Sequence, residues 1–136
     1  MNLEIFNQEE FELPFLKDYL PKVKKEFKDV KQGVNIVFVD LDRIRELNKE
    51  YRRIDKATDV LSFNIDEGNL LGEVYICPEY VKREDQIPFQ EEILRLIIHG
   101  ILHLLGYDHT VELNEETKIS EKMFVKQEKI LQNVIS

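Results

Sequence analysis

Apolar residues follow two spacings along the chain. Four short segments alternate or are rich in β-branched residues, which is typical of strands, and longer segments repeat apolar residues every three or four positions, as helices do. The strand-like segments are 3–6, 34–39, 58–63 and 71–76. The last two flank a turn at 66–69 and predict a hairpin. The pattern predicts an α/β (α+β-like) fold: one domain over residues 1–136, with a mixed four-stranded sheet packed with about five helices.

The helical segments have recognisable boundaries. Apolar residues recur from Phe15 to Val30, where Pro21 is expected to open a second helical piece and Gly33 to end the helix. Asp40 is placed to cap the next helix. A short helix is expected from Pro78, and Asn114 is expected to cap the final helix, whose apolar face holds Ile119, Met123, Ile130 and Val134.

One helix is apolar almost all round. It follows Pro88 and runs through 93–105, which is typical of a buried helix. Its polar residues fall near one face at helical spacing: Glu92, Arg95, His99 and His103. A buried neutral imidazole needs a partner to offset its desolvation, so a stripe of this kind indicates chemistry or a specific contact.

All three histidines lie within eleven residues, 99–109. His99 and His103 are four apart, so on a helix both imidazoles can reach one metal ion at about 2.0–2.1 Å. Gly106 tolerates the sharp turn that could return His109 as a third ligand. Three nitrogen ligands leave a tetrahedral zinc ion one open position, as catalytic sites do. An isolated pair at this spacing is more often a surface or capping pair, but the apolar surroundings favour a metal site.

Composition narrows the function classes. With 43% apolar residues the chain can form one ordinary core, and its single cysteine, Cys77, excludes an intrachain disulfide and a thiolate zinc site. The first ten residues lack the features of a secretory signal, and the apolar stretch 93–107 is interrupted and too short to span a bilayer. We therefore expect a cytoplasmic protein without a membrane partner.

The segment 99–109 reads HGILHLLGYDH and matches the signature HGxLHLxGYDH of the YbeY family at every fixed position. Members of this family are described as metal-dependent hydrolases, single-strand-specific endoribonucleases needed for ribosomal RNA maturation and ribosome quality control. The resemblance implies that His99, His103 and His109 bind one Zn²⁺ per chain, with His99 also counted as catalytic. The resemblance also implies the same α/β architecture. The partners that it implies are single-stranded precursor rRNA and the ribosome or associated factors, and DNA is not among them.

A second segment, 47–63, resembles the family pattern LNxxYRxxDxPTDVLSF. Arg52 matches the arginine after the tyrosine, and the resemblance implies that it clamps a phosphate, for which guanidinium geometry is suited. The alternative is an exposed arginine beside Glu50 and Asp55. The chain departs from the family at Ala57 and Asn64, where proline is usual, and we expect these two changes to loosen loop geometry. It also departs at Glu73, where the family usually has the aspartate of LGD. The resemblance covers roughly 36–110.

Two carboxylates are candidates for proton transfer or for orienting a ligand imidazole, Asp108 and Glu73. For Asp108 a structural role in the turn is an equal alternative. A metzincin-like protease shares the histidine spacing, but Gly100 stands where its glutamate base would be, and Met123 lies within a predicted helix instead of a methionine turn. A non-enzymatic ribosome-assembly factor stabilised by zinc is a third hypothesis, which the open ligand position opposes.

The net charge of −8 opposes strong non-specific binding of nucleic acid. A local basic cluster has to supply the RNA contacts: Arg43, Arg45, Lys49, Arg52, Arg53 and Lys56. Acidic neighbours dilute this cluster, so the chain predicts weak affinity for free RNA, a shallow salt dependence, and presentation of the strand by a partner.

Overall fold

The computed structural model describes residues 1–83, 86–107 and 113–136, and the side chains of all of these except 113–121. Its four strands are β1 (Asn2–Phe6), β2 (Gly33–Phe38), β3 (Val60–Glu67) and β4 (Leu70–Ile76). They form one sheet in the order β1-β2-β4-β3. β1 and β4 pair parallel to β2, and β3 pairs antiparallel to β4. The mixed four-stranded sheet and the hairpin are therefore confirmed.

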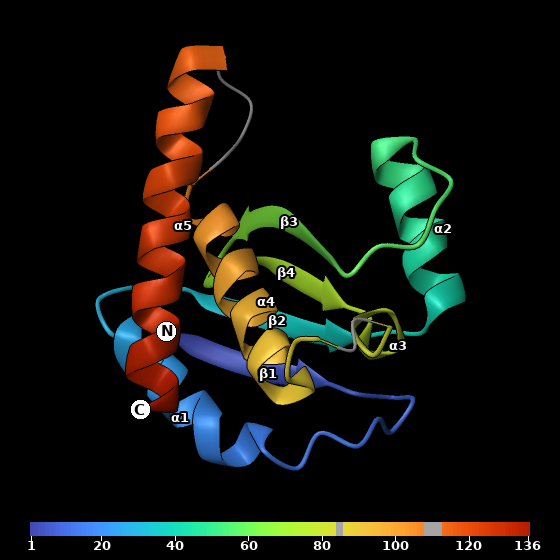
Figure 1. The fold of residues 1–136 in the computed structure, drawn as a ribbon, viewed down its shortest axis with the longest axis horizontal. Coiled ribbons are helices and arrows are strands. Elements are labelled where there is room, and N and C mark those ends of the chain that lie inside the picture. Colours follow the sequence, from blue (N-terminus) through green and yellow to red (C-terminus); the bar gives the residue numbers. More distant parts are fainter. Residues whose placement is uncertain (84–85, 108–112) are drawn as a thin grey trace.

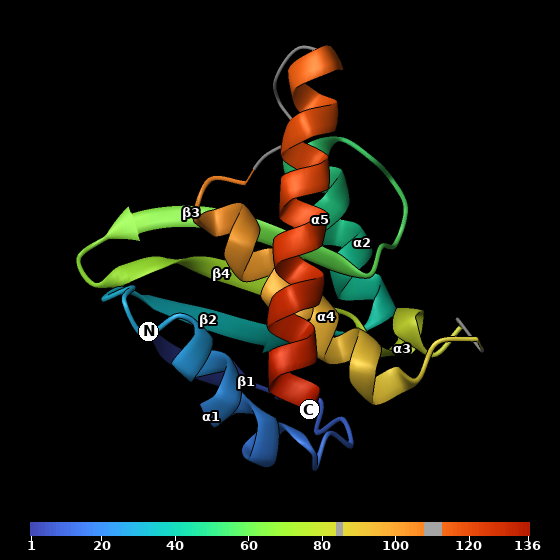
Figure 2. The same cartoon turned by 60° about the vertical axis from the view of Figure 1, so that its left-hand side comes forward.

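Five helices accompany this sheet in the described residues: α1 (Leu16–Glu26), α2 (Leu41–Arg52), α3 (Pro78–Val81), α4 (Phe89–Leu104) and α5 (Leu113–Ile135). Figure 1 shows α4 crossing one face of the sheet, with α5 beside it and α1 at the lower edge of that layer. Figure 2 shows α5 as the outermost of these helices. The helix α2 stands apart from them, beyond the end of β2.

The main core lies between the sheet and the layer formed by α1, α4 and α5. Along β4 the side chains of Val74 and Ile76 point into this core and are fully buried, and Ile36 does the same from β2. From α4, Ile97 and Ile101 are equally inaccessible. The helix α4 is buried, as its nearly continuous apolar sequence predicts.

A smaller core lies on the opposite face of the sheet. There Ile44 and Leu47 of α2 pack with Leu61 of β3 and with Val39 and Cys77. The helix begins as the sequence predicts, because the Asp40 side chain accepts a hydrogen bond from the backbone N–H of Arg43 at 2.8 Å. This smaller core fixes α2 against the end of the sheet and so determines where its last residues lie.

The first helix differs from the expectation. Pro21 does not open a second piece but lies inside one continuous helix, which ends at Glu26, so Gly33 instead begins β2. Pro21 is exposed, and water can satisfy the carbonyl that its missing N–H leaves unpaired. The continuous helix keeps Leu16 and Val23 buried together on the other side.

The third strand also differs. It runs from Val60 to Glu67 rather than over 58–63, because its pairing with β4 continues from the Val60–Ile76 pair to the Glu67–Leu70 pair. Asn64, expected to loosen a loop, lies within this strand, and its Nδ2 donates to the backbone carbonyl of Leu104 at 2.9 Å. The asparagine therefore ties β3 to the end of α4, which a proline could not do. In the part of the chain that is described, no helix combines the length and apolar character needed to cross a membrane.

Candidate active site

The helix α4 packs directly against β4, and Gly100 makes this approach possible. A Cβ atom at position 100 would be 2.5 Å from Cγ1 of Val74, so any side chain would push the helix away from the strand. With this side of α4 held against the sheet, His99 and His103 lie on a flank of the helix that is half-buried. The glycine thus fixes how far above the sheet the two imidazoles stand.

The two imidazoles face one another. Their Nε2 atoms are 3.0 Å apart, and the ring centroids are separated by 4.5 Å with the planes inclined at 73°. This places on one helix face the two groups that the sequence predicted to share a site. Gly106 adopts a φ of 104°, as expected for the residue that ends the helix, and its N–H donates to the carbonyl of His103 at 3.0 Å.

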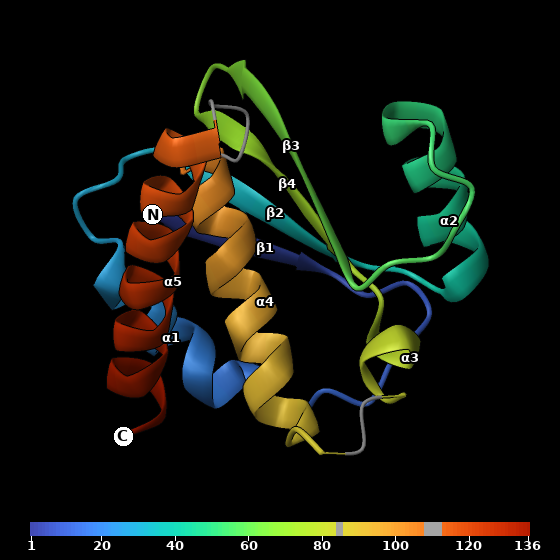
Figure 3. The same ribbon diagram turned by 45° about the horizontal axis from the view of Figure 1, so that its top comes forward.

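Both histidines line a cavity of about 630 Å³ between α4, β3 and the end of α2. Figure 3 shows α4 and α2 on either side of β3, which lies between them. In the described part of the chain, ten residues line the cavity: Tyr51, Arg52, Thr58, Asp59, Val60, Leu61, Ser62, Phe63, His99 and His103. Segments that are distant in the sequence, 51–63 and 99–103, therefore meet here.

Arg52 is the last residue of α2 and is exposed at this cavity. The chain turns sharply after it, because Arg53 takes the left-handed conformation with a φ of 59°. The next residues are held by Asn48, which is buried and donates from Nδ2 to the carbonyl of Lys56 at 2.9 Å. Arg52 forms no ion pair with any residue that the structure describes, so its charge is available to a ligand.

The spacing of the two imidazoles fits a zinc ion. Two nitrogen ligands of a tetrahedral zinc, each at about 2.0–2.1 Å, lie about 3.3 Å apart. The observed Nε2–Nε2 distance of 3.0 Å is close to this value, so small ring movements suffice. The third predicted ligand, His109, lies outside the described residues, as does Asp108. Within the described part of the chain, no three His, Cys, Asp or Glu side chains are grouped as a metal site.

The fold does not place Glu73 near the histidines. It lies on the opposite face of the sheet, in a separate cavity of about 590 Å³ that is rich in carboxylates. There its Oε1 accepts a hydrogen bond from the Tyr75 hydroxyl at 3.0 Å, and its Oε2 accepts one from Asn35 Nδ2 at 3.3 Å. Burial and this hydrogen bond raise the pKa of Tyr75 to about 12. The reason is the pleat: Val74 points to α4, so Glu73 points away from it.

The sequence did not reveal a polar contact made by α5. Gln127 is buried, and its Oε1 lies 2.8 Å from Nδ1 of His99. A signal was present, because Gln127 falls between Met123 and Ile130 on the apolar face of the predicted final helix. A polar residue on such a face indicates a buried hydrogen-bond partner. Asp59 was also missed, and among the described residues it is the carboxylate that lines the histidine cavity.

An imidazole pair can hold a catalytic metal ion and a guanidinium suits phosphate, so the two at one cavity are compatible with a hydrolase that acts on phosphate esters. Comparison with known proteins identifies the family within this class. The sequence model described as "Endoribonuclease YbeY" matches residues 4–135. The chain therefore belongs to the YbeY family of endoribonucleases, and the expectation that it is an enzyme of that family is confirmed. The match also extends well beyond the 36–110 over which the motifs resembled the family.

Individual relatives agree with this assignment. A protein named endoribonuclease YbeY from Thermotoga maritima is 46% identical over 123 residues, covering 88% of this chain and 78% of the relative. One from Sulfurihydrogenibium sp. is 44% identical over 96% of this chain and 88% of its own. The solution structure of TM1509 from Thermotoga maritima matches with a TM-score of 0.72 and 37% identity, over 97% of this chain and 88% of that one.

Proposed function

We propose that this chain is a zinc-dependent endoribonuclease that cuts single-stranded RNA in the cavity between α2 and α4. His99, His103 and His109 would hold the metal, and Arg52 would bind the phosphate. The observation that carries the proposal is the meeting of His99, His103 and Arg52 at one cavity, from segments that are far apart in the sequence. The names of the relatives, each an endoribonuclease, support the reaction class.

A zinc ion held there would supply positive charge to a bound phosphodiester and stabilise the negative charge that develops on its oxygens. Arg52 supports the same oxygens from the other side of the cavity, with donors arranged to match two of them. Asp59 lines this cavity and can accept a proton, whereas Glu73 lies on the other face of the sheet. We therefore assign Glu73 no part in proton transfer.

The wall of the cavity favours an unpaired strand. Tyr51 lines the cavity and is 60% exposed, and the centroid of its ring lies 4.9 Å from that of Phe63, which also lines the cavity. A base can stack on such a ring only when it is not stacked within a duplex. Tyr51 beside Arg52 therefore offers a stacking surface and a phosphate contact for adjacent parts of a single-stranded nucleotide.

The charges on this chain favour delivery of the RNA by a partner. In the basic cluster near α2, Arg43 pairs with Glu46 at 3.2 Å and Arg45 with Asp55 at 2.7 Å, so two of its cations are already neutralised. The net charge of −8 adds long-range repulsion. We propose that precursor ribosomal RNA is presented by the ribosome or an associated factor. Binding of a free oligonucleotide should then depend only shallowly on salt, with a slope near −0.7 per phosphate contacted.

The test uses zinc-loaded full-length protein with three substrates: single-stranded RNA, duplex RNA of the same sequence, and casein. We expect cleavage of the single strand, little cleavage of the duplex and none of casein. His103→Ala is the control for a contaminating nuclease and should cleave none of them. Cleavage of casein, or equal cleavage of RNA by the control, would contradict the proposal.

A further inference from the structure

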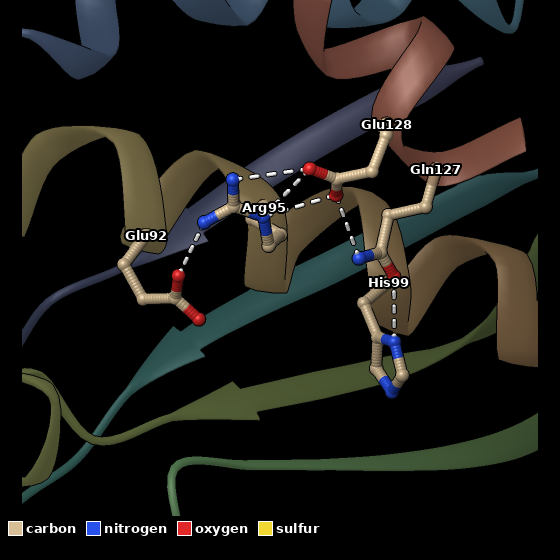
Figure 4. Close-up of polar contacts among 5 residues, drawn as sticks. All are labelled: Glu92, Arg95, His99, Gln127 and Glu128. Carbon is tan, nitrogen blue, oxygen red and sulfur yellow. Dashed lines mark hydrogen bonds and ion pairs between the residues drawn. The ribbon is translucent and has the colours of Figure 1, made fainter. Parts of the chain in front are cut away.

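A buried chain of polar contacts joins α5 to the histidine pair. Gln127 projects from α5 and is only 7% exposed, although it lies among the apolar residues of the main core. Its Oε1 lies 2.8 Å from His99 Nδ1, and its Nε2 donates to Oε2 of Glu128 at 3.1 Å. Figure 4 shows the amide between the imidazole on α4 and the carboxylate on its own helix.

The carboxylate decides how the amide is oriented. An ionised carboxylate only accepts hydrogen bonds, so the amide atom that faces Glu128 must be the NH₂ group of Gln127. The other amide atom, the oxygen, then faces His99. Because this oxygen only accepts, Nδ1 of His99 must carry the proton. The lone pair of a neutral His99 is thereby placed on Nε2, the atom that lies 3.0 Å from His103 Nε2.

Glu128 is itself held in place. Arg95 donates to it from Nε at 3.0 Å and from Nη2 at 3.1 Å, and its Nη1 pairs with Glu92 one turn earlier on α4. These hydrogen bonds raise the pKa of Arg95 above its ordinary value, so the guanidinium stays charged. The side chains of Arg95 and Glu128 are only 22% and 28% exposed. Such a fixed carboxylate leaves Gln127 one favourable amide orientation.

We propose that Gln127 is a positioning residue, which holds neutral His99 in the tautomer whose Nε2 lone pair faces His103 and the cavity. The inference rests on the proposed function, because that lone pair is what a metal ion would use. It makes α5 a part of the site, although none of the described side chains of α5 line the cavity. The carboxylate and guanidinium act through Gln127 and do not touch the reacting groups.

The test compares three variants. Gln127→Leu has nearly the same size but no acceptor. The double variant Q127E/E128Q exchanges the two groups, so that a carboxylate accepts from His99 while the amide bonds to Arg95. Ile130→Val is the packing control, since Ile130 lies on the same helix with the same 7% exposure. For each protein, nitrogen NMR of the metal-free form reports the tautomer of His99, and competition with a chelator gives the zinc affinity.

We expect the parent and Ile130→Val to carry the proton on Nδ1 and to bind zinc equally. Gln127→Leu should lose this tautomer preference and bind zinc about 10–100-fold more weakly, the usual cost of losing such a partner. The exchanged pair should restore both readouts. The proposal would be overturned if Gln127→Leu kept the His99 tautomer and the zinc affinity of the parent. It would also be overturned if Q127E/E128Q failed to restore the tautomer. A parent that binds no zinc would instead refute the proposed function, and the tautomer would still decide the role of Gln127.

Discussion

Two cavities of similar size and opposite chemistry lie at different strands of the sheet. Among the described residues, the cavity between α4, β3 and α2, about 630 Å³, is lined by two imidazoles, a guanidinium and one carboxylate, that of Asp59. The described residues that line the second cavity, about 590 Å³, include a single guanidinium, that of Arg43, among five carboxylates: Glu9, Asp40, Asp42, Glu46 and Glu73. Among the described residues the two cavities share no strand: β3, at one edge of the sheet, lines the first, whereas β1, β2 and β4 line the second.

This difference decides where a polyanion can bind. A phosphodiester placed in the carboxylate cavity would meet several like charges at short range, which are costly to bring together. In the histidine cavity it meets the guanidinium of Arg52 and two imidazoles, where a bound cation would add further positive charge. The acidic net charge of the chain is thus compatible with an RNA substrate, because many of the carboxylates lie away from the histidine cavity.

The largest effect is expected when the guanidinium of the histidine cavity is removed. Arg52→Ala should reduce cleavage of single-stranded RNA about 100- to 1,000-fold, the cost of one donor to transition-state charge. Zinc content and melting temperature should not change, because Arg52 pairs with no described residue. Arg53→Ala is the neighbouring control and should have a milder effect. Parental cleavage by both variants would place the phosphate contact elsewhere.

Gly100 tests whether the approach of α4 to the sheet sets the site. Gly100→Ala should destabilise the fold by about 1–3 kcal/mol, because its methyl group would overlap Val74. Urea unfolding measures this loss. In the Val74→Ala background the same change should cost much less, since the valine methyl groups are then absent. Equal costs in both backgrounds would mean that this contact does not limit the approach of the helix.

The link between α4 and α5 predicts a pH dependence of stability. Burial alone would raise the pKa of the Glu128 carboxyl, but hydrogen bonds from Arg95 and Gln127 outweigh it and hold that pKa below its ordinary 4.5. The folded state thus binds this proton less tightly than the unfolded state, so the stabilisation is complete above the ordinary pKa and is lost as pH falls through the folded one.

Glu128→Gln removes this contribution. We expect it to cost about 1–3 kcal/mol at neutral pH and progressively less below about pH 4.5, because the parent also loses the charge there. Urea unfolding of both proteins across this range provides the measurement. A difference between them that grows toward acid pH would show that Glu128 does not stabilise the fold as a carboxylate.

The smallest effect is expected on the other face. Glu73→Gln should change RNA cleavage by less than about twofold, because Glu73 bonds to Tyr75 and Asn35, away from the histidines. It should cost roughly 1 kcal/mol of stability through the altered hydrogen bonds. A large loss of cleavage with stability unchanged would show that the two faces are functionally connected.

Much of this arrangement could be predicted from the sequence, because local rules governed it. The alternation of β4 and the nearly continuous apolar sequence of α4 each allowed one interpretation, and the histidine spacing placed His99 and His103 on one face. Asp40 and Gly106 act as the cap and the turn that their residue types indicate. The second motif singles out Arg52, and the structure has this residue at the end of α2, where it lines the histidine cavity.

The remainder depended on contacts between distant segments. Glu73 is a candidate because it supplies a carboxylate where the family pattern has LGD, whereas the alternation along β4 turns it away from the histidines. Gln127 was missed because its partner, His99, is 28 residues away. Pro21 was expected to break a helix that tertiary packing keeps continuous. In each case the deciding interaction was absent from the local sequence pattern.

The most direct test of the account is zinc content by elemental analysis, measured after mild purification on the parent, His103→Ala and Glu73→Gln. We predict about one zinc per chain in the parent and in Glu73→Gln, and almost none in His103→Ala, because a site that loses one of three nitrogen ligands binds the ion weakly. Full zinc retention in His103→Ala, or its loss in Glu73→Gln, would contradict the assignment of the metal to the histidine face.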